Sequence, residues 1–138
     1  MKINSLRTKI LQCVGTLLPF VVIFLLTKVF FEDVYLLEWL LRHWYCGLWL
    51  IAVVIAIFNF KLSLAISYSN IIAIVLGQFV GDAIQEYNIS QITPDMSAEQ
   101  QAHMHLHYGV PIWLFSLLLF VAIFLVIYFI RKKKINQT

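Results

Sequence analysis

The feature that most constrains the fold is a set of four apolar stretches, each about twenty residues long. A helix rises about 1.5 Å per residue, so about 20 apolar residues cross the roughly 30 Å hydrocarbon core of a bilayer. Lipid cannot hydrogen-bond the backbone, so each stretch must form a helix to satisfy its own N–H and C=O groups. The sequence therefore predicts an all-α integral membrane protein, a bundle of four transmembrane helices. The predicted spans are residues 10–31, 40–60, 62–80 and 110–130.

Composition supports a membrane protein and argues against a soluble one. Of the 138 residues, 62% are hydrophobic and 12% are charged, against roughly 45–50% and 25% in soluble domains. No linker or internal repeat divides the chain, so we expect a single membrane domain over residues 1–138. No small-residue cleavage site follows the first apolar stretch, which indicates an uncleaved first span. Residues 32–39 could extend the second span or lie on the membrane surface, and the sequence leaves both open.

The basic residues divide unevenly between the two sides of the predicted bundle. One side has only Lys28 and Arg42, together with all seven acidic residues. The other side has Lys2, Arg7, Lys9, Lys61, Arg131, Lys132, Lys133 and Lys134. Lys and Arg concentrate in the cytoplasmic segments of multi-pass membrane proteins. We therefore expect both termini and the turn at Lys61 to be cytoplasmic, in a multi-pass protein of the inner cell membrane.

The third predicted span is the most polar, and its polar and small residues share one face at 100° per residue. They are Ser63, Ser67, Asn70, Gly77, Gln78, Gly81 and Gln85. Gly77 and Gly81 form a GxxxG pair, which lets another backbone approach closely, while Asn70 and Gln78 can hydrogen-bond across such a contact. One interpretation of this stripe is a packing seam, within the bundle or between two copies in a homodimer. The alternative is a polar path for a substrate.

The predicted outer loop, residues 81–109, is the only long polar segment between spans. Asp95 or Ser97 is suited to cap a short helix within it. Asp82 and Glu86 lie at its start, at the outer mouth of the third span. We therefore expect a short outer helix in the loop between spans three and four.

A metal site is one interpretation of the imidazole groups in this loop. The candidate ligands are Glu99, His103, His105 and His107. On a helix, Glu99, His103 and His107 would share one face, whereas on an extended segment the three histidines would share one side. Imidazole and carboxylate ligands suit zinc or copper. The alternatives are a water-exposed helix without a ligand and a loop that gains positive charge at acidic pH.

Motifs of common enzymes are absent from the sequence. It has no HExxH, GxSxG, Walker or CxxC motif, which favours a non-enzymatic function. We expect an accessory, regulatory or immunity-like subunit that acts by binding. The alternatives are a small homo-oligomeric transporter or channel with a polar path along span three, and a metal-dependent membrane enzyme. The expected partners are the lipid bilayer and another membrane protein or a second copy of the chain, with no nucleic acid.

Overall fold

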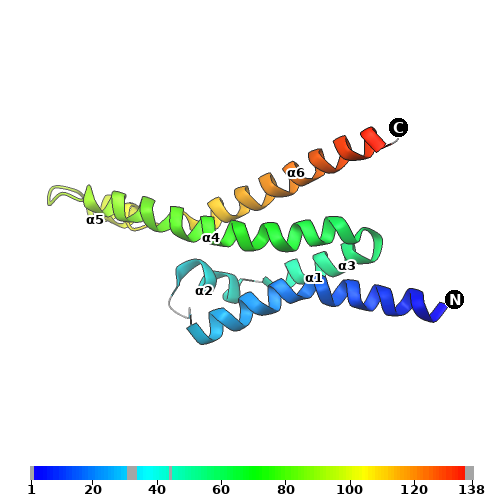
Figure 1. The fold of residues 1–138 in the computed structure, drawn as a ribbon. Helices are drawn as coiled ribbons and strands as arrows, with labels where there is room; N and C mark the ends of the chain where they lie inside the picture. The colour runs from blue at the N-terminus through cyan, green and yellow to red at the C-terminus, as the bar shows by residue number, and fades with distance from the viewer. Residues whose placement is uncertain (1, 31–33, 44, 136–138) are drawn as a thin grey trace.

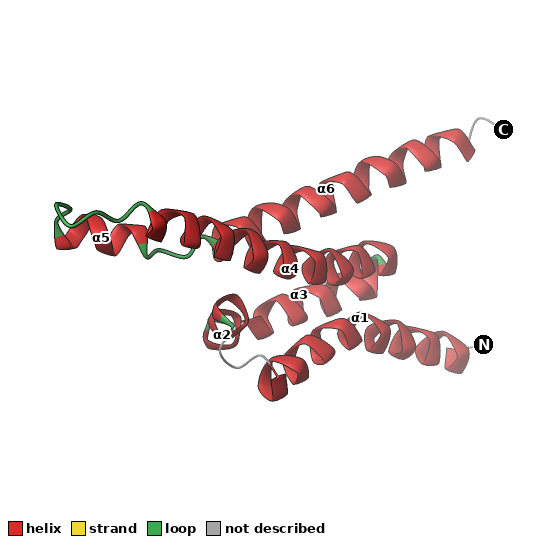
Figure 2. Ribbon diagram, turned by 60° about the vertical axis from the view of Figure 1, so that its left-hand side comes forward, coloured by secondary structure: helices red, strands yellow, loops and turns green. Residues whose placement is uncertain are grey.

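The computed structural model describes residues 2–30, 34–43 and 45–135, and these residues form helices joined by short turns and loops. The described residues contain no strand, so the prediction of an all-α fold is confirmed (Figure 2). The helices are α1 (Lys2–Phe30), α2 (Tyr35–Arg42), α3 (Tyr45–Phe58), α4 (Phe60–Ser90), α5 (Ala98–Met104) and α6 (Gly109–Ile135).

Three of the helices, α1, α4 and α6, are long and apolar enough to cross a membrane. Together, α2 and α3 pass the same test, but the two are bent by 74° relative to each other. The fold therefore supplies three membrane-spanning candidates, or four if α2 and α3 count as one span. α3 has 14 residues and is about 21 Å long, which is short for an unaided crossing.

The predicted second span, residues 40–60, is not one continuous helix, because α2 ends at Arg42, α3 begins at Tyr45 and the two are bent by 74° relative to each other. α2 buries Leu36 and Leu40 against the bundle. Its other face exposes Arg42, which forms an ion pair with Glu38. Charged groups are costly in the hydrocarbon core and favourable at its surface, which explains why this segment does not continue in line with α3.

The bend bears on the open question about residues 32–39. The part of this segment that lies in α2 does not extend the second span in line. Residues 32 and 33 lie outside the described part of the chain. The described part therefore agrees with a short helix set at an angle to the span.

α4 is the central helix of the described structure, since it contacts each of the other five helices. In its most apolar window 44% of the residues are buried, compared with 22% in α1 and 11% in α6. Among the described helices, α6 contacts α4 and α2 and no other. In Figure 1 both termini and the α3–α4 turn lie at one end, and α2 and α5 lie toward the other. We call these the terminal end and the loop end.

α4 is longer than the predicted span of residues 62–80. It continues to Ser90, so its 31 residues extend about 46 Å. The last ten residues of α4 therefore belong to what the sequence suggested was loop. The expected short helix in the remaining loop is present as α5. Ser97 rather than Asp95 caps it, through a capping box with Gln100.

Three glycines set the distance between α4 and α6. A Cβ atom added at Gly77 would lie 2.8 Å from the carbonyl oxygen of Gly109. A Cβ added at Gly81 would lie 2.8 Å from the backbone nitrogen of Gly109 and would also meet the ring of His107. Backbone atoms cannot move aside as a flexible side chain can, so only glycine permits this approach. The GxxxG pair of α4 thus lies against the first turn of α6.

We predict that Gly81→Ala destabilises the protein, by about 1–3 kcal/mol, the usual cost of overpacking. The matched control is Gly47→Ala, at a helical glycine with nothing within 4 Å. This control should be neutral or slightly stabilising, since alanine favours the helix. Unfolding of both variants in detergent micelles measures the difference, and equal effects would contradict the close contact.

Candidate functional site

A hydrogen-bonded network at the loop end links α2, α4 and the segment that leads into α6. The backbone N–H of Leu36 donates to Gln78 Oε1 at 2.8 Å. Gln78 Nε2 donates to Asp82 Oδ1 at 2.7 Å, and His107 Nε2 lies 2.9 Å from the same oxygen. The backbone N–H of Gly109 donates to His107 Nδ1 at 2.9 Å. These bonds fix the start of α6 on α4.

The two bonds of His107 determine which ring nitrogen carries the proton. Nδ1 accepts from Gly109, so it is unprotonated, and Nε2–H then donates to the Asp82 carboxylate. The His107 side chain is only 2% exposed. Its ring also stacks on Tyr35 of α2, with the ring centroids 4.1 Å apart. His107 is therefore a packing and positioning residue in this structure.

The other candidate metal ligands do not gather around His107. α5 ends at Met104, and His107 lies beyond that end. The helical face shared by Glu99, His103 and His107 is therefore not formed. The extended alternative is not formed either, because His103 lies within α5.

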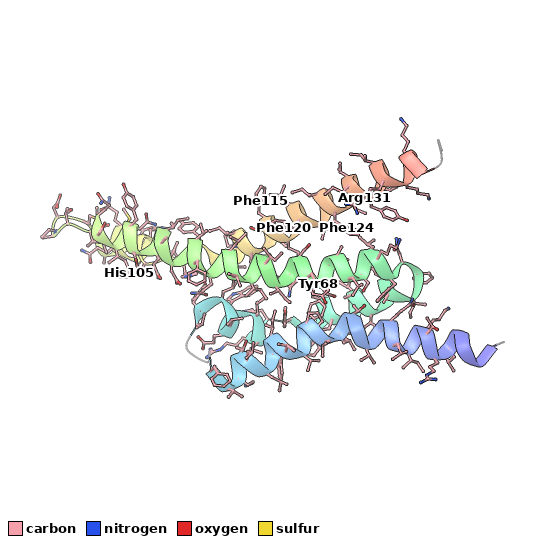
Figure 3. All side chains as sticks on the ribbon, viewed as in Figure 1. Tyr68, His105, Phe115, Phe120, Phe124 and Arg131 are labelled. Atoms are coloured by element: carbon pink, nitrogen blue, oxygen red, sulfur yellow. The ribbon has the colours of Figure 1, made fainter. Side chains whose placement is uncertain are left out.

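The remaining candidates in the loop are likewise not part of a cluster. The backbone carbonyl of His105, rather than its ring, accepts a hydrogen bond from Gln85 (2.7 Å), and Figure 3 shows His105 at the loop end. Glu86 is exposed on α4. Over the described ranges no group of three or more His, Cys, Asp or Glu side chains is placed to hold a metal ion.

Asn70, in the first half of α4, binds two aromatic side chains. Its Nδ2 donates to the hydroxyl of Tyr45 in α3 at 2.6 Å. Its Oδ1 accepts from the indole Nε1 of Trp113 in α6 at 3.0 Å. Asn70 is fully buried, and both halves of its amide are satisfied. One side chain thus connects three helices.

The two serines of the stripe pack α4 against α1 and α3. Ser63 Oγ lies 2.6 Å from the carbonyl oxygen of Ala52 and 3.1 Å from Thr16 Oγ1. Ser67 Oγ lies 3.0 Å from the carbonyl oxygens of both Thr16 and Ser63. All three hydroxyl side chains are buried. The polar side chains of the α4 stripe are therefore hydrogen-bonded to other segments of the same chain.

We predict that Tyr45→Phe and Asn70→Leu are coupled in a double-mutant cycle. Hydrogen bonds between membrane helices average about 0.6 kcal/mol, with a maximum near 1.7 kcal/mol, and we expect a coupling in this range. Asn70→Leu alone should cost more, since it also leaves the Trp113 indole unpaired. Unfolding in detergent micelles measures each free energy, and strictly additive effects would contradict the bond.

A cleft opens between α4 and α6 toward the terminal end of the bundle. α6 diverges from α4 in this direction (Figure 1). The cleft has a volume of about 710 Å³. Its lining residues are Lys61, Leu64, Ala65, Tyr68, Ser69, Ile72, Phe124, Ile127, Tyr128, Arg131 and Lys132. The walls are mainly apolar, and Figure 3 labels Tyr68 on α4 and Phe124 and Arg131 on α6.

The mouth of the cleft is basic. Lys61 begins the α4 wall, and Arg131 and Lys132 end the α6 wall. Lys61 Nζ lies 5.9 Å from the centroid of the Tyr128 ring, a cation–π distance across the cleft. The site could not be predicted from the sequence, because Lys61 and Arg131 lie seventy positions apart and no pattern indicates that they meet at one opening.

Comparisons of the chain with protein-family models, with curated proteins and with solved structures found no match.

Proposed function

We propose that this protein crosses the membrane four times, with both termini in the cytoplasm, and acts by binding as an accessory subunit. The binding site in this proposal is the α4–α6 cleft, and its ligand is an apolar component of the bilayer. The observation that carries the proposal is the cleft itself. It has apolar walls, lies between two membrane-spanning candidates, and is of a volume typical for small-molecule sites, about 300–1,000 Å³.

The arrangement of the helix ends supports an even number of crossings. Both termini lie at the same end of the bundle as the α3–α4 turn (Figure 1). This end holds the basic residues that the positive-inside rule assigns to the cytoplasm. In the proposal α2 and α3 together form the second span, with α3 in the hydrocarbon core and α2 at an angle to it at the outer surface.

The way α6 is held supports a binding function. Near its start, α6 is fixed by Gly109 against α4, by His107 and by the Trp113–Asn70 bond. Beyond that, it has contacts with no helix other than α4 and α2 within the described chain. A helix fixed at one end and splayed at the other leaves room for a ligand between itself and its neighbour.

The rival proposals have less support in the structure. A transporter with a polar path along span three needs polar groups that face a path. Ser63, Ser67, Asn70 and Gln78 are instead hydrogen-bonded within the bundle. A metal-dependent enzyme needs a ligand cluster, and the described residues form none.

We predict that filling the cleft reduces lipid binding. Ile72 and Val75 are matched residues of α4, 49% and 48% exposed, but only Ile72 lines the cleft. With a photoreactive phosphatidylcholine in micelles, the wild-type protein should crosslink at the cleft walls. Ile72→Trp should lower that crosslinking several-fold, and Val75→Trp should leave it unchanged. Crosslinks spread evenly over the apolar surface, or insensitive to Ile72→Trp, would contradict the proposal.

Topology is tested independently by cysteine labelling in intact cells. Cys13 and Cys46 are first replaced by alanine, and single cysteines are then placed at Ser97 and at Lys133. A membrane-impermeant maleimide added outside should label the Ser97→Cys protein and spare the Lys133→Cys protein until the membrane is permeabilised. The reverse pattern, or labelling of both from outside, would overturn the orientation or the even number of crossings.

A further inference from the structure

We propose that the ligand of the α4–α6 cleft is an anionic phospholipid of the cytoplasmic leaflet, with an acyl chain between the helices and its phosphate at the basic mouth. This inference rests on the proposed function and names the ligand class. It is carried by two features of one site, the apolar walls and the cations at only one end of them.

Charge complementarity selects an anionic headgroup. Lys61, Arg131 and Lys132 come from two helices and meet at one opening. All three are exposed, and none of them is in an ion pair among the described residues. The described acidic residues lie in α2, in the second half of α4 and in the loop and helix that follow it. A phosphate at the mouth would therefore meet three cations without a competing carboxylate.

The order of groups along the cleft matches the order of groups along a lipid. Below the basic mouth, the walls are formed by Leu64, Ile72, Phe124 and Ile127. Going from Lys61 to Ile72 takes eleven positions, a depth of about 16 Å along α4. This depth is about half of a hydrocarbon core of roughly 30 Å. A lipid of the cytoplasmic leaflet would have its phosphate at the level of the basic mouth and its acyl chains at the level of the apolar walls.

The charge at the mouth favours a lipid over an apolar helix of a partner protein. An anionic headgroup would pair with Lys61, Arg131 and Lys132, whereas an apolar helix in the cleft would leave them without a counter-charge. Acyl chains are narrower than a helix and adapt to an irregular wall. A partner helix, or a second copy of α6, is therefore the alternative occupant that the experiment must detect.

The experiment compares two charge-removing variants at the same end of the bundle. K61Q/R131Q removes two cations from the mouth, and R7Q/K9Q removes two from α1, away from the cleft. Each protein is purified in mild detergent and incubated with equal amounts of phosphatidylglycerol and phosphatidylcholine. Native mass spectrometry then gives the ratio of the two lipids bound. The soluble headgroup glycerophosphoglycerol is added in a parallel sample as a competitor without chains.

The wild-type protein should retain phosphatidylglycerol over phosphatidylcholine. A basic side chain near an anionic surface contributes about fivefold in affinity, so K61Q/R131Q should lower the preference by about 25-fold. R7Q/K9Q should change it less than threefold, and the free headgroup should not displace the lipid. A photoreactive phosphatidylglycerol should label wild-type residues 61–72 and 124–132, a readout that does not depend on the folding of any variant.

Each contrary outcome identifies the claim that fails. Equal losses in both double variants, or an unchanged ratio in K61Q/R131Q while Ile72→Trp still blocks binding, would overturn the anionic headgroup and leave the cleft as a lipid site. Displacement by the free headgroup would indicate a phosphate site that does not use the chains. Loss of all lipid in the wild-type protein, with a partner chain crosslinked in the cleft, would overturn the proposed lipid ligand as well.

Discussion

The close contact between the GxxxG pair of α4 and the first turn of α6 is the constraint on which the rest of the structure depends. Gly77 and Gly81 allow the backbone of Gly109 to approach to a distance at which no Cβ fits. In a bilayer, lipid chains are as apolar as leucine, so helices associate through close packing and polar contacts rather than through the hydrophobic effect. The glycine contact provides such packing. Once it is formed, Asn70 and Asp82 lie opposite their partners Trp113 and His107.

The position of this contact, at the start of α6, explains why the second half of α6 lies apart from α4. The described hydrogen bonds from other helices to α6 and to the segment before it involve His105, His107 and Trp113, all near the start of α6. Farther along, α6 carries apolar side chains such as Leu118 and Phe129, which are 62% and 61% exposed. Such side chains are as well solvated by lipid as by protein, and the described contact between the two helices there is the cation–π pair of Lys61 and Tyr128. The cleft follows because this half of α6 has no close backbone contact of the kind that Gly109 makes with α4.

The sequence predicted the parts of the fold that depend on local chemistry. The helical spans follow from length and hydropathy, and the helix cap at Ser97 follows from the side chains around it. The extension of α4 to Ser90 was missed because residues 82–90 are polar and were interpreted as loop. They contain no Pro or Gly that would end a helix. Hydropathy reports where a helix leaves lipid, whereas helix formation continues until a breaker is met.

The sequence did not predict features that depend on tertiary contacts. Helical spacing suggested that His107 would join Glu99 and His103. It packs instead on Tyr35 and binds Asp82, because α5 ends before it and α4 extends beside it. The cleft between α4 and α6 could not be predicted from the sequence either. An apolar face directed at lipid and one directed at another helix have the same composition, so residues such as Ile72 and Phe124 carry no signal of the gap between them.

The central claim is that α6 is fixed to α4 at the loop end and separated from it at the terminal end. Pulsed electron spin resonance in bilayers tests this most directly, with spin labels on a protein whose Cys13 and Cys46 are replaced by alanine. One pair is placed at Val80 and Leu114, near the glycine contact, and a second pair at Leu62 and Lys133. The account predicts a longer mean distance for the second pair than for the first. Equal mean distances for both pairs, as expected for two helices packed together along their whole length, would contradict it.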